Sequence, residues 1–331
     1  MLTTPYFPTL RSGLAALGRR TAQALRQTTL NQLQEHLRDL LPVPLLSAED
    51  EGLNSRERIY SLRLTFECFL WQMLKPRTSC REVVRQVQAL FRLQARGLVD
   101  EGDWAYVQAR HRLPRERFEK ALAATAQAAD HRAGSVGQLQ GRPVKAADGS
   151  STQMPDTAEN QKRYPQPAAQ KTGCGFPVMK LVALFSLSSG AILNVMLGSL
   201  RHHDLRLLRG LWEQLKKGDI LLGDRAFGEY TTLAGLPAQG VDVVARLHSR
   251  RKVDFRKARR LGHLDGLFLW TKGYQQSEIL SAKEWALLPA QITVRILRFT
   301  ATIRGFRGRR ITLVSTLLDP KLYPAQELVG L

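Results

Sequence analysis

Two aspartates lie where strand ends can bring carboxylates together. Asp148 is in the strand-like segment VKAADGSS at 144–151, and Asp224 follows the apolar residues of the strand-like segment DILLGDRAF at 219–227. If these strands are neighbours in a sheet, their backbones lie about 4.8 Å apart and both carboxylates meet at one end of the sheet. Mg²⁺ in proteins prefers one or two carboxylates, completed by water and phosphate oxygens. Both aspartates are therefore candidate metal ligands.

The chemistry that such a pair supports is cleavage and transfer of phosphodiesters. Two divalent ions about 3.5–4 Å apart activate the attacking oxygen and stabilise the leaving one. Gly149 and Gly223 stand beside the two aspartates and leave room for a close approach of the backbones. A plainer alternative stays open from the residues alone, since Asp-Gly is common in turns and Gly-Asp at strand ends.

A series of elements has to position these two residues. The expected order is three strands, helix, strand, helix, strand, at 144–151, 178–190, 191–200, 204–217, 219–227, 229–238 and 241–248. Ser189-Gly190 joins the second and third strands as a hairpin. This order predicts an α/β mixed sheet with flanking helices. It is similar to the ribonuclease H-like fold, in which the first and fourth strands lie side by side.

The charge balance favours a polyanionic partner. The 331 residues include 49 Lys and Arg against 29 Asp and Glu, a net charge of +20. Cations near phosphates release condensed counterions, so nucleic acid is the favoured partner, against the alternative of an arginine-rich soluble protein. Three scattered cysteines, with no signal peptide and no long apolar run, predict a cytoplasmic protein without a membrane span.

Residues 1–135 are expected to form a helical N-terminal DNA-binding region, joined by a Gly-rich linker at 136–143 to the rest. One predicted helix begins at Ser79, with Val83, Val84, Val87, Leu90 and Phe91 on its apolar side. Its other side carries Gln88 and four candidate DNA-binding arginines, Arg81, Arg85, Arg92 and Arg96. A solvated surface is the alternative for this basic stripe.

Two longer segments resemble a known family. The stretch DGSSTQMPDTAENQKRYPQPAAQKTGCGFP (148–177) and the stretch GDILLGDRAFGEY (218–230) resemble the first- and second-aspartate regions of DDE transposases of bacterial insertion sequences, specifically the insertion sequence 4 family. The resemblance covers about 140–331. It implies a ribonuclease H-like core, Asp148 and Asp224 as catalytic metal ligands, Mg²⁺ (or Mn²⁺) as cofactor, element terminal repeats and target DNA as partners, and a homodimer in the DNA complex.

The resemblance also implies how the core is divided. The first part of the core would span 144–248, a basic and mainly β insertion 249–305, and the resumed core 306–331. The insertion is rich in arginine near both ends, at 249–260 and 295–310. We expect DNA contacts from Arg225, Tyr164, Gln170, Arg250, Arg251 and Lys252. A solvated basic surface, and for Arg225 a structural salt bridge, are the alternatives.

The family's third acid is a glutamate on a helix after the last core strand, in a Tyr, Arg, Glu, Lys signature. This chain reads LYPAQELVGL at 322–331, which resembles the approach to that signature, so no third catalytic glutamate is assigned and Glu327 does not receive the role. The expectation is a transposase that hydrolyses and transfers DNA strands at element ends, truncated and catalytically crippled as this chain. The alternative is a non-catalytic DNA-binding remnant or regulator.

Overall fold

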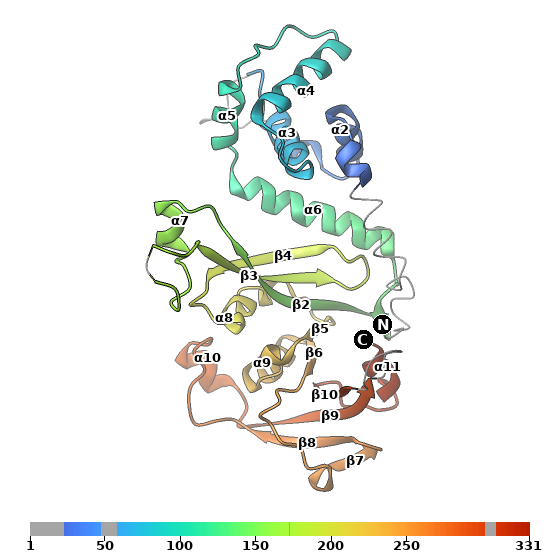
Figure 1. The fold of residues 1–331 in the computed structure, drawn as a ribbon. Coiled ribbons are helices and arrows are strands. Elements are labelled where there is room, and N and C mark those ends of the chain that lie inside the picture. Colours follow the sequence, from blue (N-terminus) through green and yellow to red (C-terminus); the bar gives the residue numbers. More distant parts are fainter. Residues whose placement is uncertain (1–22, 48–57, 172, 302–308) are drawn as a thin grey trace. The chain divides into compact units, whose positions relative to one another are not determined.

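The computed structural model describes residues 23–47, 58–171, 173–301 and 309–331. The chain divides into a helical unit within Thr9–Ala128 and a sheet unit that contains Ala129–Leu331. Helix α6 (Arg115–Ala133) runs from the one into the other (Figure 1). The boundary therefore falls inside a helix, a few residues before the predicted end of the N-terminal region at residue 135.

The helical unit packs short helices around one apolar core. Its elements are α2 (Leu30–Arg38), η1 (Val43–Leu46), α3 (Leu62–Leu74), α4 (Cys80–Leu93) and α5 (Trp104–His111). Helix α3 is buried on most sides, because even Glu67 in its middle is 2% exposed. That carboxylate accepts hydrogen bonds from Gln34 and Arg63, which satisfies the buried charge.

The predicted two-sided helix is confirmed in α4. Ser79 is its N-cap and accepts the backbone N–H of Glu82. All five residues of the predicted apolar side are buried: Val83, Val84, Val87, Leu90 and Phe91. Arg96 departs from the prediction, because α4 ends at Leu93 and the Arg96 guanidinium folds back over the Phe91 ring, 3.9 Å from its centroid.

The sheet unit is built on one mixed sheet. Its strands follow the order β4-β3-β2-β5-β6-β10-β9-β8-β7, with β1 paired to β2 (Figure 1). The strands are β1 (Gln138–Leu139), β2 (Arg142–Gln153), β3 (Val178–Ser186), β4 (Ile192–Ser199), β5 (Ile220–Gly223), β6 (Asp242–Arg246), β7 (Arg259–Gly262), β8 (Asp265–Thr271), β9 (Gln291–Ala301) and β10 (Arg309–Ser315). Strands β2, β5 and β6 are parallel, and the other pairs are antiparallel. The predicted mixed sheet is confirmed, and its first and fourth predicted strands, β2 and β5, are neighbours.

The two faces of this sheet carry different cores. One face holds Ala147, Val182, Leu221 and Val243, and it packs against the side chains of α8 (Asp204–Arg209), η2 (Trp212–Gln214), α9 (Tyr230–Gly235) and α10 (Ala282–Leu287). We call it the helix-covered face. The other face holds Val144, Ile220, Val244 and Leu313, and it packs against Tyr323 and against Leu328 of α11 (Ala325–Gly330).

Two segments differ from the expected elements. Residues 136–143, expected to be a linker, contain β1 and the start of β2, and Leu139 is fully buried. The helix expected over 204–217 ends at Arg209, where Gly210 follows and a Cβ would meet Met196 at 2.7 Å. Strand β9, which lies in the segment 249–305 expected to be mainly β, pairs with β10 along seven residues and so extends the sheet.

No helix in the described part of the chain is long and apolar enough to cross a membrane.

Candidate active site

The two predicted aspartates lie side by side where the parallel pairing of β2 with β5 ends. In this parallel pair Ala147 is the register partner of Gly223, so Asp148 and Asp224 are the next residues on adjacent strands. Side chains alternate along a strand, so both aspartates point to the face of Val144 and Ile220. Both are exposed. The arrangement gives two adjacent carboxylates that are open to solvent on one face of the sheet.

Arg246 continues this row on the third parallel strand. Its register follows from the pairing of Gly223 with Ala245, and its Nη1 lies 3.5 Å from Asp224 Oδ1. Sequence reasoning did not single out this residue. In the sequence, Arg246 is recognisable only as a cation at the end of an apolar strand, and such residues are common on protein surfaces. The structure thus places a positive charge beside one of the two carboxylates.

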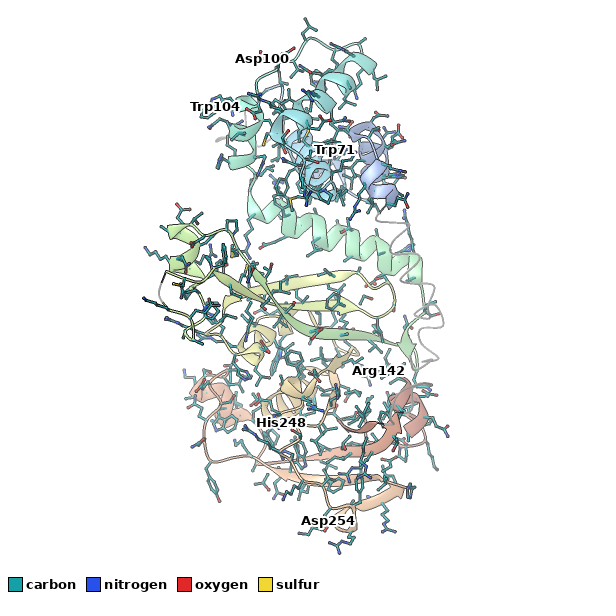
Figure 2. All side chains as sticks on the ribbon, viewed as in Figure 1. Trp71, Asp100, Trp104, Arg142, His248 and Asp254 are labelled. Carbon is teal, nitrogen blue, oxygen red and sulfur yellow. The ribbon has the colours of Figure 1, made fainter. Side chains whose placement is uncertain are left out.

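The opposite ends of the same strands are tied together by Arg142, at the start of β2 (Figure 2). Its guanidinium donates to the carbonyls of Gly218 and Asp219 just before β5, and it pairs with Asp242 at the start of β6 at 2.8 Å. It also donates to the Tyr323 hydroxyl. One side chain therefore connects the three parallel strands that carry Asp148, Asp224 and Arg246, which helps to hold their register.

The polar loop after β2 is organised by two glutamines. Gln161 donates to Asp156 and to the Gly175 carbonyl, while Gln166 donates to the carbonyl of Gln170 and accepts the N–H of Gly175. Neither glutamine was singled out from the sequence. Of the loop residues expected to contact DNA, Gln170 is exposed, but Tyr164 is 8% exposed. The Tyr164 ring therefore offers little surface to a substrate strand.

Basic side chains surround the end of the sheet that carries the aspartates. Arg225 directly follows Asp224, and among the described residues it has no carboxylate partner, so the structure does not show the alternative salt bridge. Arg250, Arg251 and Lys252 follow β6 and are exposed. The Arg251 guanidinium lies over the ring of Trp270, 3.8 Å from its centroid.

Comparison with known proteins identifies the family. The family model described as Transposase DDE domain matches residues 139–329, which is more than half of the chain.

The chain belongs to this family.

A curated relative is the transposase InsG for insertion sequence element IS4 of Escherichia coli (strain K12), which is 23% identical over 306 residues. The match covers 92% of this chain and 66% of the relative. The resemblance to DDE transposases of the insertion sequence 4 family is therefore confirmed.

Two solved structures are similar only in part. The endonuclease V of Bacillus subtilis is 10% identical, with a TM-score of 0.27, and the match covers 66% of this chain and 82% of that one. The Mos1 transposase paired-end complex with left transposon end is 15% identical, with a TM-score of 0.21, and the match covers 72% of this chain and 74% of that one.

The register of β2 and β5 brings the two aspartates together but places no third carboxylate beside them among the described residues. The part of the chain that the structure describes contains no group of three or more His, Cys, Asp or Glu able to hold a metal ion. Glu327 accepts a hydrogen bond from Gln140, which precedes β2, so it lies at the other end of the strand from Asp148. The six residues from Arg142, where β2 begins, to Asp148 span roughly 20 Å at about 3.3 Å per residue.

Two neighbouring histidines are explained by local structure. His202 Nδ1 accepts the Ser199 N–H, and the side chain of His203 caps α8 by accepting the Leu205 N–H.

In the helical unit, the arginines expected to contact DNA are all exposed: Arg81, Arg85, Arg92 and Arg96. Arg85 pairs with Glu82 at 3.4 Å, so an acid stands beside the basic stripe of α4. Exposed pairs of this kind are worth little and are easily exchanged for a phosphate. Arg81 and Arg92 have no ion-pair partner among the described residues.

Proposed function

We propose that this chain acts in DNA transposition, with Asp148 and Asp224 as the carboxylates that hold a divalent metal ion for hydrolysis and transfer of DNA strands. The observation that carries the proposal is the register of β2 and β5, which brings the two aspartates together on one face. The strand order is also consistent with a ribonuclease H-like core. The family match independently supports the reaction class.

The donor set fits a hard cation. Two exposed carboxylates on adjacent strands leave the remaining positions to water and phosphate oxygens, which is how Mg²⁺ is usually bound, and Mn²⁺ takes similar ligands. When bound, the metal supplies an activated attacking oxygen and stabilises the leaving one. Arg246 places a guanidinium 3.5 Å from the Asp224 carboxylate, so a cation of the protein also lies at this site.

The surrounding cations would bind the DNA backbone. Arg225, Arg250 and Lys252 lie close to Asp224 in the sequence or on the next loop, and none has an ion-pair partner among the described residues. Contacts to phosphates position a duplex without reading its sequence. We propose the same role for the basic stripe of α4, with a homodimer holding two element ends in the bacterial cytoplasm.

A second candidate is a DNA-binding protein of transposase origin without catalysis. The observation that favours it is the place of Glu327, which lies far from the two aspartates. In the described residues no other acid completes a three-carboxylate site. A protein of this kind would occupy element ends through its basic side chains.

Strand nicking separates the two candidates. Supercoiled plasmid DNA is incubated with the chain and Mg²⁺ or Mn²⁺, and nicking is compared between the wild type, Asp148→Asn and Asp224→Asn. Asp254→Asn is the matched control, because Asp254 is a carboxylate outside the site that pairs with Arg256. Nicking by the wild type and the control alone supports catalysis. DNA binding without nicking by any of the four supports the second candidate.

A further inference from the structure

The connection between α4 and α5 lies against the side of α4 that carries the basic stripe. Val99 of this connection is buried, and its carbonyl accepts a hydrogen bond from the side-chain amide of Gln88 at 3.1 Å. Beyond Val99, a pocket of about 450 Å³ separates the connection from α4. One wall of the pocket is formed by Arg81, Val84, Arg85 and Gln88, and the other by Glu101, Gly102 and Asp103. The connection therefore returns along the arginine-bearing side of the helix.

This part of the connection is an acidic segment, residues 100–103, in which only Gly102 is not an acid. Asp100 accepts the backbone N–H of Gly102 at 3.1 Å, so its carboxylate is used within the turn (Figure 2). Asp103 is at the N-cap position of α5, but its side chain accepts no capping hydrogen bond. The carboxylates of Glu101 and Asp103 both line the pocket and form no ion pair within the described part of the chain.

Charges of opposite sign thus face each other across the pocket without an ion pair between them. Arg85 pairs with Glu82 of its own helix, and Arg81 has no carboxylate partner in the described residues. The side chains of Arg81, Arg85 and Glu101 are exposed, so water and salt screen the attraction across the pocket. Both arginines therefore stay available to another anion, but that anion must approach two carboxylates at the same time.

We propose that the acidic segment competes with DNA for the arginines of α4 and lowers the affinity of the chain for duplexes of any sequence. The inference rests on the proposed contact of α4 with DNA. Contacts between arginines and phosphates supply the part of DNA binding that does not depend on sequence. Carboxylates within a Debye length of those phosphates, about 10 Å at 0.1 M salt, repel them. The segment therefore weakens this sequence-independent part.

The test is titration of a fluorescent random-sequence duplex with the whole chain at low salt. Glu101→Gln combined with Asp103→Asn removes both charges and nearly keeps the side-chain shapes. This double variant should bind about tenfold tighter than the wild type, and the gain should shrink as the salt concentration rises. Thermal melting of each variant confirms that it is folded.

A matched control separates this local effect from net charge. Glu35→Gln combined with Asp39→Asn also removes two acids, which are exposed, belong to α2 and its C-cap, and lie outside the pocket. This control should gain less than about twofold, because its charges are not placed against the arginines of α4. Equal affinity of the control and the Glu101→Gln/Asp103→Asn variant would overturn the proposal.

A second measurement shows whether the acids act through α4. Arg81→Ala should weaken the Glu101→Gln/Asp103→Asn variant more than the wild type, because the arginine binds phosphate at full strength only when the acids are absent. Arg115→Ala, which changes an arginine paired with Glu119 on α6, should affect neither. A gain that persists in full after Arg81→Ala combined with Arg85→Ala would also overturn the proposal.

Failure of the proposal and failure of the proposed function give different results. If Arg81→Ala combined with Arg85→Ala weakens the wild type but removal of the acids brings no gain, the competition is refuted and the DNA contact of α4 stands. If neither the arginine variants nor the acid variants change the affinity, α4 does not contact the duplex, and its proposed role in DNA binding is contradicted together with the competition.

Discussion

Replacement of Arg295 by methionine tests how the sheet is fastened to the segment before α11. Arg295 is fully buried and donates to both oxygens of Asp265 at 2.9 and 2.6 Å, and to the Tyr323 carbonyl at 2.6 Å. Asp265 is itself 6% exposed. The change leaves a buried carboxylate and a buried carbonyl without their donor. Breaking one side of a buried ion pair costs about 3–5 kcal/mol.

A loss of about 3–5 kcal/mol is large against the free energy of unfolding of a whole domain. Domains are stable by about 5–15 kcal/mol, so Arg295→Met removes a substantial fraction of the free energy of unfolding. Urea unfolding followed by far-UV circular dichroism should show a lower midpoint at unchanged slope. Arg295→Met combined with Asp265→Leu should recover most of the loss, because an apolar pair no longer buries an unpaired charge. A single variant within about 1 kcal/mol of the wild type, or a double variant no better than the single one, would refute the reasoning.

Three further predictions concern the backbone, pH and DNA affinity. Gly137→Ala should cost more stability than Gly134→Ala in thermal melts: both glycines have positive φ, but only at Gly137 would a Cβ meet a backbone carbonyl, at 2.8 Å. Glu229→Gln should stabilise the fold at pH 7, because burial raises the pKa of the Glu229 carboxyl above 4.5 and its charged form lowers the free energy of unfolding. Below pH 4.5 the carboxyl is protonated in the folded and the unfolded state, so this gain is lost. Arg92→Ala should lower the slope of log affinity against log salt by about 0.9 in DNA titrations, whereas Arg115→Ala, whose side chain already pairs with Glu119, should not.

The aspartates and their strands were predictable because their signals are local. Apolar runs that end in Asp148 and Asp224 define strands, and Ser189-Gly190 defines the hairpin between β3 and β4, where Gly190 has a φ of +73°. Adjacency of β2 and β5 then followed from the order of elements and from the family resemblance. The register that places the two carboxylates together is the step that the structure adds.

Arg295 and Arg246 show what local patterns could not supply. Arg295 belongs to the basic segment 295–310, for which DNA contacts were predicted, yet its side chain is buried. Its partner there is Asp265 of β8, thirty residues earlier in the sequence. Residues 302–308 of that segment lie outside the described structure. Arg246 gains its place beside Asp224 only through the pairing of β5 with β6. In both cases the decisive partner is distant in sequence.

A shared metal site is the central claim, and Mn²⁺ binding tests it without DNA. Electron paramagnetic resonance of free Mn²⁺ gives the affinity of the chain and of Asp148→Asn, Asp224→Asn and Asp254→Asn. Loss of either site aspartate should weaken binding by at least about tenfold, and the Asp254 control should bind as the wild type does. Unchanged Mn²⁺ affinity in both Asp148→Asn and Asp224→Asn would contradict the account.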